Sequence, residues 1–414
     1  MDASVQKAHF FRRASFGATP TELYSNSNPS DYLNYWLNTQ ISVNVPYLGA
    51  IGDGSDRGKQ VAQLYEWLIG QMVSAANPLH ERMVNFWREY FTVSLRNGMP
   101  PQAITDYEIR LRGLALGDFR DLLYSVATSP AMLRYLNNDQ NRVNNLNENF
   151  SRELMELFTL GEGNYTEKDV QEGARSLTGW VVRTDRDAGV LTAEFQAARS
   201  DNKSKTYLGR TGNLKTEDVV EILANHPATA KYLANRLWSY FVFPNPEAGI
   251  VNYLADVFTK YNRSIGAVIS VIFSLKHFYS DRAYYSQIKD PIGFMIGSLR
   301  QLEIKANSEK VIQALRAMGQ VFYDAPTVKG WKGGTGWLTA PSLLTRLNTA
   351  RQLTQDYAAG NANGYTYNPQ YTADQLLGLL LDQQIDPKIR ANAQALSIRD
   401  ATALILSAPN YQLF

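Results

Sequence analysis

The sequence predicts a mainly α-helical fold, a bundle of many helices in a single domain over residues 1–414, with one small β-hairpin insertion near residues 180–196. Three observations predict it. Apolar residues recur every three or four positions along most of the chain, as in helices that bury one side. Prolines stand at the start of several of these segments, where a helix tolerates them. Alternation typical of strands occurs in one stretch only.

The apolar spacing assigns helices along the whole chain. Pro78, for example, precedes a segment in which Met83, Trp87 and Phe91 share one side. Hydrophobic residues make up 44% of the 414 residues, which is enough for a sizeable core. The ranges predicted as helices are 31–37, 59–75, 79–91, 119–127, 131–136, 147–161, 166–177, 227–241, 247–261, 264–274, 291–304, 308–318, 341–358 and 396–407.

One segment departs from helical spacing. Residues 179–184 and 190–195 read as two strands around a polar, glycine-ended turn at residues 185–189, which predicts a β-hairpin. The following residues 199–213 are polar and interrupted by glycine, so a long loop is expected there. Hairpin and loop together form a predicted insertion over residues 180–213.

Composition excludes several classes of protein. The net charge of +2 leaves no basic surface of the kind that binds nucleic acid, and no run of 18 apolar residues predicts a membrane span. The chain has no cysteine, so disulfides, thiolate metal sites and cysteine nucleophiles are excluded. Its 4 histidines restrict imidazole metal sites. The first residues lack the apolar core of a signal peptide, so the protein is either not exported or a mature form.

The predicted helix at residues 147–161 gathers charge on one side. Glu148, Arg152, Glu153 and Glu156 fall within about 140° of its circumference. Close carboxylates raise one another's pKa and also suit hard metal ions, so this face is a candidate for acid–base chemistry or a divalent metal. The alternative is structural, because Glu148–Arg152 and Arg152–Glu156 have the i,i+4 spacing of helical ion pairs.

Several stretches together carry a family resemblance that runs from residue 9 to the end of the chain. They are residues 9–20, 81–87, 91–94, 148–157, 163–166, 177–180, 205–209, 226–230, 328–331 and 410–412. In combination they resemble a bacterial family described as domain of unknown function 1800. The resemblance implies an extracytoplasmic protein, periplasmic or secreted, because members look like exported proteins that are often encoded beside a sulfatase-like partner.

Two departures from the family pattern remove histidines. The family usually reads Trp-His-x-His-Phe where this chain has Trp87-Arg88-Glu89-Tyr90-Phe91, and often His-Asp where this chain has Ser200-Asp201. Two histidines at i and i+2 sit about 200° apart on a regular helix, so they could share a metal only where the helix ends or distorts. The candidate pocket from the sequence consists of Glu148, Arg152, Glu153, Glu156, Arg88, Tyr90 and Asp201.

Two hypotheses about function follow, and the first is preferred. The chain is a non-catalytic or degenerate family member, a possible pseudoenzyme, that binds a protein partner or assembles with itself and needs no cofactor. The alternative is an enzyme that uses Glu148, Glu153 and Glu156, with a divalent metal and with Arg152 orienting a carboxylate. No catalytic residue is assigned.

Overall fold

The protein is mainly α-helical, as predicted, with 59% of its residues in helices. The structure, a computed structural model, describes residues 1–41, 45–48, 57–185, 190–355, 364–382 and 386–414. The α-helices of these ranges are α1 (Ala3–Ala14), α2 (Pro20–Leu23), α3 (Pro29–Asn38), α4 (Arg57–Val73), α5 (Pro78–Tyr90), α6 (Pro101–Leu114), α7 (Phe119–Ala127), α8 (Pro130–Tyr135), α9 (Asn149–Glu156), α10 (Glu167–Ser176), α11 (Thr216–Ala224), α12 (Pro227–Phe241), α13 (Ala248–Lys260), α14 (Ile265–Ser274), α15 (Pro291–Gln301), α16 (Ser308–Met318), α17 (Ala340–Thr354), α18 (Ala373–Leu381), α19 (Pro387–Ala395) and α20 (Ile398–Ser407).

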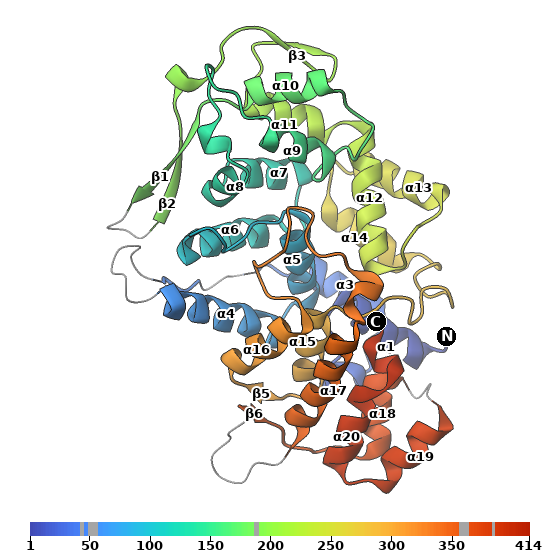
Figure 1. The fold of residues 1–414 in the computed structure, drawn as a ribbon. Helices are drawn as coiled ribbons and strands as arrows, with labels where there is room; N and C mark the ends of the chain where they lie inside the picture. Colours follow the sequence, from blue (N-terminus) through green and yellow to red (C-terminus); the bar gives the residue numbers. More distant parts are fainter. Residues whose placement is uncertain (42–44, 49–56, 186–189, 356–363, 383–385) are drawn as a thin grey trace.

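Helix α5 lies near the middle of the molecule. Figure 1 shows α5 and α6 there, with α7–α11 on one side of them, α15–α20 on the other, and α12–α14 beside α5. The hydrophobic core is continuous through these layers, from Phe10 to Tyr411. Asn77 caps α5 by accepting a hydrogen bond from the His80 N–H, and Pro78 occupies its first turn. The position of α5 makes both of its sides available to other elements.

Helix α6 had no counterpart in the sequence prediction. Its hydrophobic pattern is diluted by charged residues, and the structure shows why these are tolerated. Glu108 and Arg112 are almost completely buried because they pair with charged residues of α5. Two charged residues of α6 are therefore part of the core.

The predicted hairpin is present, formed by β1 (Trp180–Asp185) and β2 (Val190–Phe195), which pair antiparallel from Trp180 with Phe195 to Asp185 with Val190. The turn residues 186–189 lie outside the described residues. The long loop expected at residues 199–213 is wrong in part, because it contains a second hairpin of β3 (Lys205–Tyr207) and β4 (Arg210–Gly212). Its two-residue turn uses Leu208 and Gly209, both with positive φ, the conformation of tight hairpin turns.

The remaining sheet is small. Strands β5 (Lys305–Ala306) and β6 (Tyr365–Thr366) pair antiparallel. Helix α9 is shorter than the stretch predicted for it, ending at Glu156, after which the chain turns and reaches Gly161 with a φ of +76°. In the part of the chain that the structure describes, no helix combines the length and the apolar character needed to cross a membrane.

Candidate functional site

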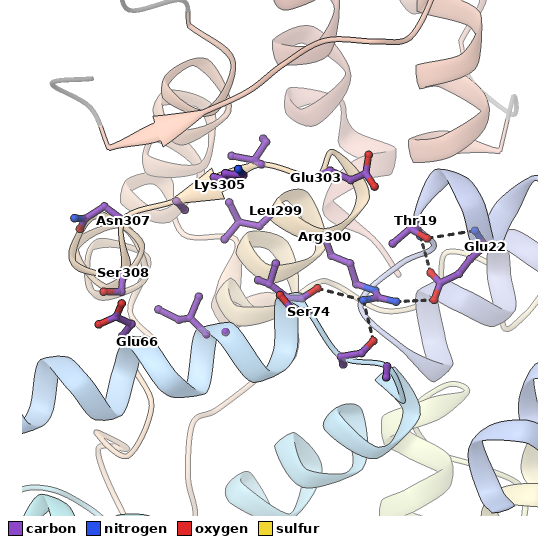
Figure 2. A pocket seen from close by; sticks show the side chains of 17 residues that line it. Thr19, Glu22, Glu66, Ser74, Leu299, Arg300, Glu303, Lys305, Asn307 and Ser308 are labelled. Carbon is purple, nitrogen blue, oxygen red and sulfur yellow. Dashed lines mark hydrogen bonds and ion pairs between the residues drawn. The ribbon is translucent and has the colours of Figure 1, made fainter. Parts of the chain in front are cut away.

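One cavity between the helices lies at the end of α4, against α15 and the start of α16, and has a volume of about 860 Å³. Figure 2 shows Arg300 extended toward Glu22 in this cavity. Arg300 Nη2 donates to Glu22 Oε1 at 2.6 Å, and Nη1 donates to the main-chain oxygens of Val73 and Ala75. The buried cation of this cavity is therefore already neutralised, and its role is to tie α15 to the end of α4.

A second cavity, of about 410 Å³, lies between α5 and α12. Its other walls are the chain before α15 and the glycine-rich loop at residues 331–337, which we call the tryptophan loop. The lining residues are Arg82, Phe86, Glu89, Asn235, Arg236, Ser239, Tyr240, Gln287, Ile288, Asp290, Trp331, Lys332, Gly333, Gly334, Trp337 and Phe414. Three of the stretches that carry the family resemblance contribute to or adjoin this set, at residues 81–87, 328–331 and 410–412.

Helical spacing explains how α5 contributes. Arg82, Phe86 and Glu89 are separated by four and three residues, so they project from one side of the helix. Asn85 lies between them and donates to Glu89 Oε1 at 3.2 Å and to the Tyr240 hydroxyl of α12 at 3.2 Å. The side of α5 that faces the cavity is thus polar and connected to α12.

Two carboxyl groups meet at the cavity wall. Asp290 caps α15, with Oδ1 accepting from the Gly293 N–H at 2.8 Å. The side-chain amide of Gln320 donates to Glu89 Oε1 at 3.2 Å and to Asp290 Oδ2 at 3.3 Å. Gln320 is itself oriented, because its Oε1 accepts from the Ile292 N–H at 3.0 Å. One amide therefore holds both carboxyl groups side by side.

The surroundings of Glu89 favour its protonated form. Burial raises the pKa of Glu89 to about 8, and the charge of Asp290 and a hydrogen bond to it act in the same direction. Arg82 and Arg88 lower this pKa without cancelling those effects. Two carboxyl groups that share one proton supply an acid and a base in the same place, which is the arrangement used for proton transfer in enzymes.

The tryptophan loop closes the cavity from the side of α9. It follows Gly330, whose φ of +78° is a left-handed conformation that favours glycine. Lys329 Nζ lies 2.9 Å from Glu156 Oε1 and 3.5 Å from Glu162 Oε1. The loop is therefore attached to α9 by an ion pair immediately before Trp331 enters the cavity wall.

The charged face of α9 forms local contacts. Arg152 donates to both carboxylate oxygens of Glu167, at 2.7 and 2.8 Å, and Glu148 lies 3.7 Å from it, as the i,i+4 spacing predicts. Glu156 instead accepts from Lys329 and, at 3.0 Å, from the Tyr165 hydroxyl. Arg152 and Glu148 remain partly exposed.

Glu153 differs from its neighbours on α9. Its Oε2 is buried and has no hydrogen-bond partner in the described structure. Burial raises the pKa of Glu153, and the charge of Glu156 raises it further. This carboxyl group is the one member of the face whose environment departs from simple ion pairing.

The other three sequence candidates lie elsewhere. Arg88 is buried and donates to both oxygens of Glu108, at 3.0 and 2.7 Å. The Tyr90 hydroxyl donates to the main-chain oxygen of Phe158 at 3.0 Å. Asp201 accepts from Arg175 Nε at 2.8 Å.

The contacts of these seven residues divide them among different parts of the structure. Arg88 and Tyr90 leave opposite sides of a regular helix that continues to residue 90, as their i,i+2 spacing requires. The residue between them, Glu89, is the one that faces the cavity. Within the described ranges, no group of three or more histidine, aspartate or glutamate side chains is placed to hold a metal ion.

Sequence reasoning missed Asp290 and Gln320 and passed over Glu89. Asp290 precedes Pro291, so in the sequence it reads as a helix cap, and one of its oxygens does serve as a cap. Gln320 lies just beyond Gly319, which ends α16 in a left-handed conformation. The sequence did contain one signal. Arg82 and Glu89 have the spacing that places two charged residues on one side of α5, a helix that is otherwise rich in aromatic residues.

Comparison with known proteins places the chain in a family without adding an activity. A search of curated proteins found no match, and a search of solved structures found none either. A family model described as "Protein of unknown function (DUF1800)" matches residues 9–413. Since the match covers nearly the whole chain, the protein belongs to the DUF1800 family.

Proposed function

We propose that the protein binds a small molecule in the cavity between α5 and α12 and transfers protons to and from it through Glu89 and Asp290. The observation that carries this proposal is the pair of carboxyl groups, Glu89 and Asp290, which one amide holds side by side at a cavity of about 410 Å³ and of which Glu89 has a raised pKa. That volume suits a small organic molecule, and aromatic side chains with a few placed polar groups are the usual lining of such sites.

The two carboxyl groups have different roles when the ligand arrives. Glu89, whose pKa is raised to about 8 by burial, is the acid, and Asp290, fixed by the Gly293 N–H, is the base. After one proton has passed in each direction, the pair still holds one proton, now on Asp290, and the return of that proton to Glu89 through water resets the site. Gln320 and Asn85 keep the acceptor oxygens in position throughout.

A second candidate function is the non-catalytic one, a binding or assembly protein outside the cytoplasm. Arg88 and Tyr90 stand where the family pattern has histidines, and both form buried structural contacts, with Glu108 and with the main chain of Phe158. These contacts favour a non-catalytic role for the two positions. An enzyme built on the Glu148–Glu156 face has less support, because Arg152 and Glu156 are already bound to Glu167, Lys329 and Tyr165.

Turnover of chromogenic substrates separates the two functions. Purified protein is incubated with p-nitrophenyl esters, phosphates and glycosides, beside the variants Glu89→Gln and Asp290→Asn. Turnover of one class that falls about 100-fold or more in both variants supports proton transfer by the pair. Glu194→Gln on the hairpin, where Glu194 pairs with Arg183, is the matched control and retains full turnover. Turnover that survives both cavity substitutions overturns the proposal.

A further inference from the structure

Arg82 is the exception among the buried arginines of the described structure. It is 2% exposed, and its Nε and Nη1 have no hydrogen-bond partner. The other buried arginines all donate to a carboxylate or a main-chain oxygen. They are Arg12 with Asp382, Arg13 with Phe241 and Val242, Arg88 with Glu108, Arg112 with Glu81, Arg300 with Glu22, and Arg346 with Lys289.

Aromatic rings hold the Arg82 guanidinium in place. Its central carbon lies 4.4 Å from the ring centre of Phe414, 4.6 Å from that of Tyr240 and 5.3 Å from that of Phe16. These contacts fix the plane of the group and offset part of the loss of water. They supply no acceptor for its N–H groups, and a buried charged donor without an acceptor is costly.

The charges around the cavity leave Arg82 uncompensated. Arg236 and Lys332, both exposed, add two positive charges at the rim. Against these three cations the lining has two carboxyl groups, Glu89 and Asp290, and burial raises the pKa of Glu89. Glu89 lies within the electrostatic range of Arg82, but no ion pair joins them. The lining of the cavity therefore has more cationic than carboxyl side chains, and Arg82 is one of its residues.

We propose that the cavity accepts a small carboxylic acid with an apolar part, whose carboxylate binds Arg82 and whose apolar part packs against Trp331 and Phe86. This rests on the proposed function, because it names the substrate class of the same cavity. The planar guanidinium matches the two oxygens of a carboxylate. A doubly charged phosphate fits less well, since its second charge meets the negative charge of the Glu89–Asp290 pair.

Phenylacetate tests the assignment, because it combines one carboxylate with one aromatic ring. Binding is followed by isothermal titration calorimetry and by the fluorescence of Trp331 and Trp337, at pH 6.5, below the raised pKa of Glu89. Phenylacetamide, which has the same shape without the charge, and inorganic phosphate are titrated in parallel. We expect phenylacetate to bind at least about tenfold more tightly than either comparison compound.

Variants of Arg82 test whether its charge binds the carboxylate of phenylacetate. Arg82→Gln should weaken phenylacetate binding at least about tenfold and leave the weak binding of phenylacetamide unchanged. Arg82→Lys, which keeps the charge without the planar fork, should fall between. Arg183→Gln on the hairpin is the control, since Arg183 pairs with Glu194 and is exposed. If Arg82→Gln does not fold, the comparison of phenylacetate with phenylacetamide on the unaltered protein still decides.

Three results would overturn the inference: equal binding of phenylacetate and phenylacetamide, tighter binding of phosphate, or undiminished phenylacetate binding by folded Arg82→Gln. The Glu89→Gln variant separates this inference from the proposed function. Because glutamine has the charge of protonated Glu89, the variant should bind phenylacetate as before while losing turnover. Loss of turnover with retained binding supports both statements, and retained turnover with retained binding overturns only the proton-transfer function.

Discussion

Lys329 Nζ lies 2.9 Å from Glu156 Oε1, so the charged face of α9 is joined to the loop that carries Trp331. The charged face of α9 and the tryptophan loop of the cavity are thereby neighbours with different roles. The face of α9 holds the loop, and the cavity lies on the loop's other side, against α5 and α12. A substitution on α9 is therefore expected to reach the cavity only through the position of this loop.

The Lys329–Glu156 pair contributes little to stability. The Lys329 side chain is 62% exposed, and exposed ion pairs stabilise proteins by about 1 kcal/mol or less. We expect Glu156→Gln to lower the free energy of unfolding in urea by about 1 kcal/mol or less, while the fluorescence of Trp331 changes. A loss of about 3 kcal/mol or more would show that the face of α9 is a buried network.

The Arg88–Glu108 ion pair, unlike the exposed Lys329–Glu156 pair, is buried. Glu108 is completely buried between Arg88, Arg112 and the Tyr323 hydroxyl. Glu108→Gln leaves two buried arginines short of a counter-charge, which costs about 3–5 kcal/mol. Equilibrium unfolding in urea measures this loss. Asp324→Asn, which breaks the exposed pair with Arg96, is the control and costs about 1 kcal/mol or less.

Protonation of Glu89 makes stability depend on pH. Its pKa is raised from the ordinary value of 4.5 to about 8 in the folded protein, facing Asp290, Arg82, Arg88 and Tyr240. The folded state therefore holds this proton more tightly than the unfolded state. The stabilisation is complete below pH 4.5 and is lost as the pH rises to about 8, by at most about 1.4 kcal/mol per unit.

Comparison with Glu89→Gln isolates that contribution from those of all other groups. The difference in unfolding free energy between the two proteins is measured in urea from pH 5 to pH 9. It should fall with rising pH in this window and become constant above about pH 8. A difference that does not vary with pH would mean that Glu89 is ionised throughout.

Restoring the two histidines of the family pattern should not restore a metal site. Arg88 faces Glu108 of α6, whereas Tyr90 faces the main chain at Phe158, about 200° away around α5. The Arg88→His, Tyr90→His double variant is therefore expected to bind Zn²⁺ no better than the unaltered protein in calorimetry. Stoichiometric binding by the double variant alone would show that α5 can unwind at its end.

Gly173 is required by the close packing of α10 against α9 and β3. A Cβ atom there would lie 2.3 Å from Ser151 Oγ and 2.8 Å from the Tyr207 ring. Gly173→Ala should destabilise the protein by about 1–3 kcal/mol, as overpacking does. Gly70→Ala in α4, where the added atom meets nothing within 4 Å, is the matched control and should be stabilising by up to about 1 kcal/mol. Thermal unfolding compares the two.

Local signals predicted most of the fold. Pro78 marked the start of α5, and the i,i+4 spacing of Glu148 and Arg152 gave their contact. These relationships depend on neighbours in sequence, which helical geometry places directly. Helix α6 was not predicted, because its charged residues Glu108 and Arg112 have the sequence pattern of surface residues and are buried only through their pairing with α5.

The cavity between α5 and α12 was not predicted either, because its residues are far apart in the sequence. Glu89 and Asp290 are separated by about two hundred positions in the chain, and Gln320 joins them from a third segment. Nothing local distinguishes Asp290 from an ordinary cap, because capping is also one of its contacts. The resemblance drew attention to residues 88 and 90, and the helical turn places those on either side of the residue that matters for the cavity.

The two walls of the cavity are held by contacts of very different strength. Helix α5 is fixed to α6 by buried charges, whereas the tryptophan loop is attached to α9 by a pair that water and salt reach. Amide hydrogen exchange should therefore be slowest along α5 and fast in residues 329–336, with the loop opening more often as ionic strength rises. Entry to the cavity would then be controlled by the salt concentration through the loop, while the geometry of the carboxyl pair stays constant.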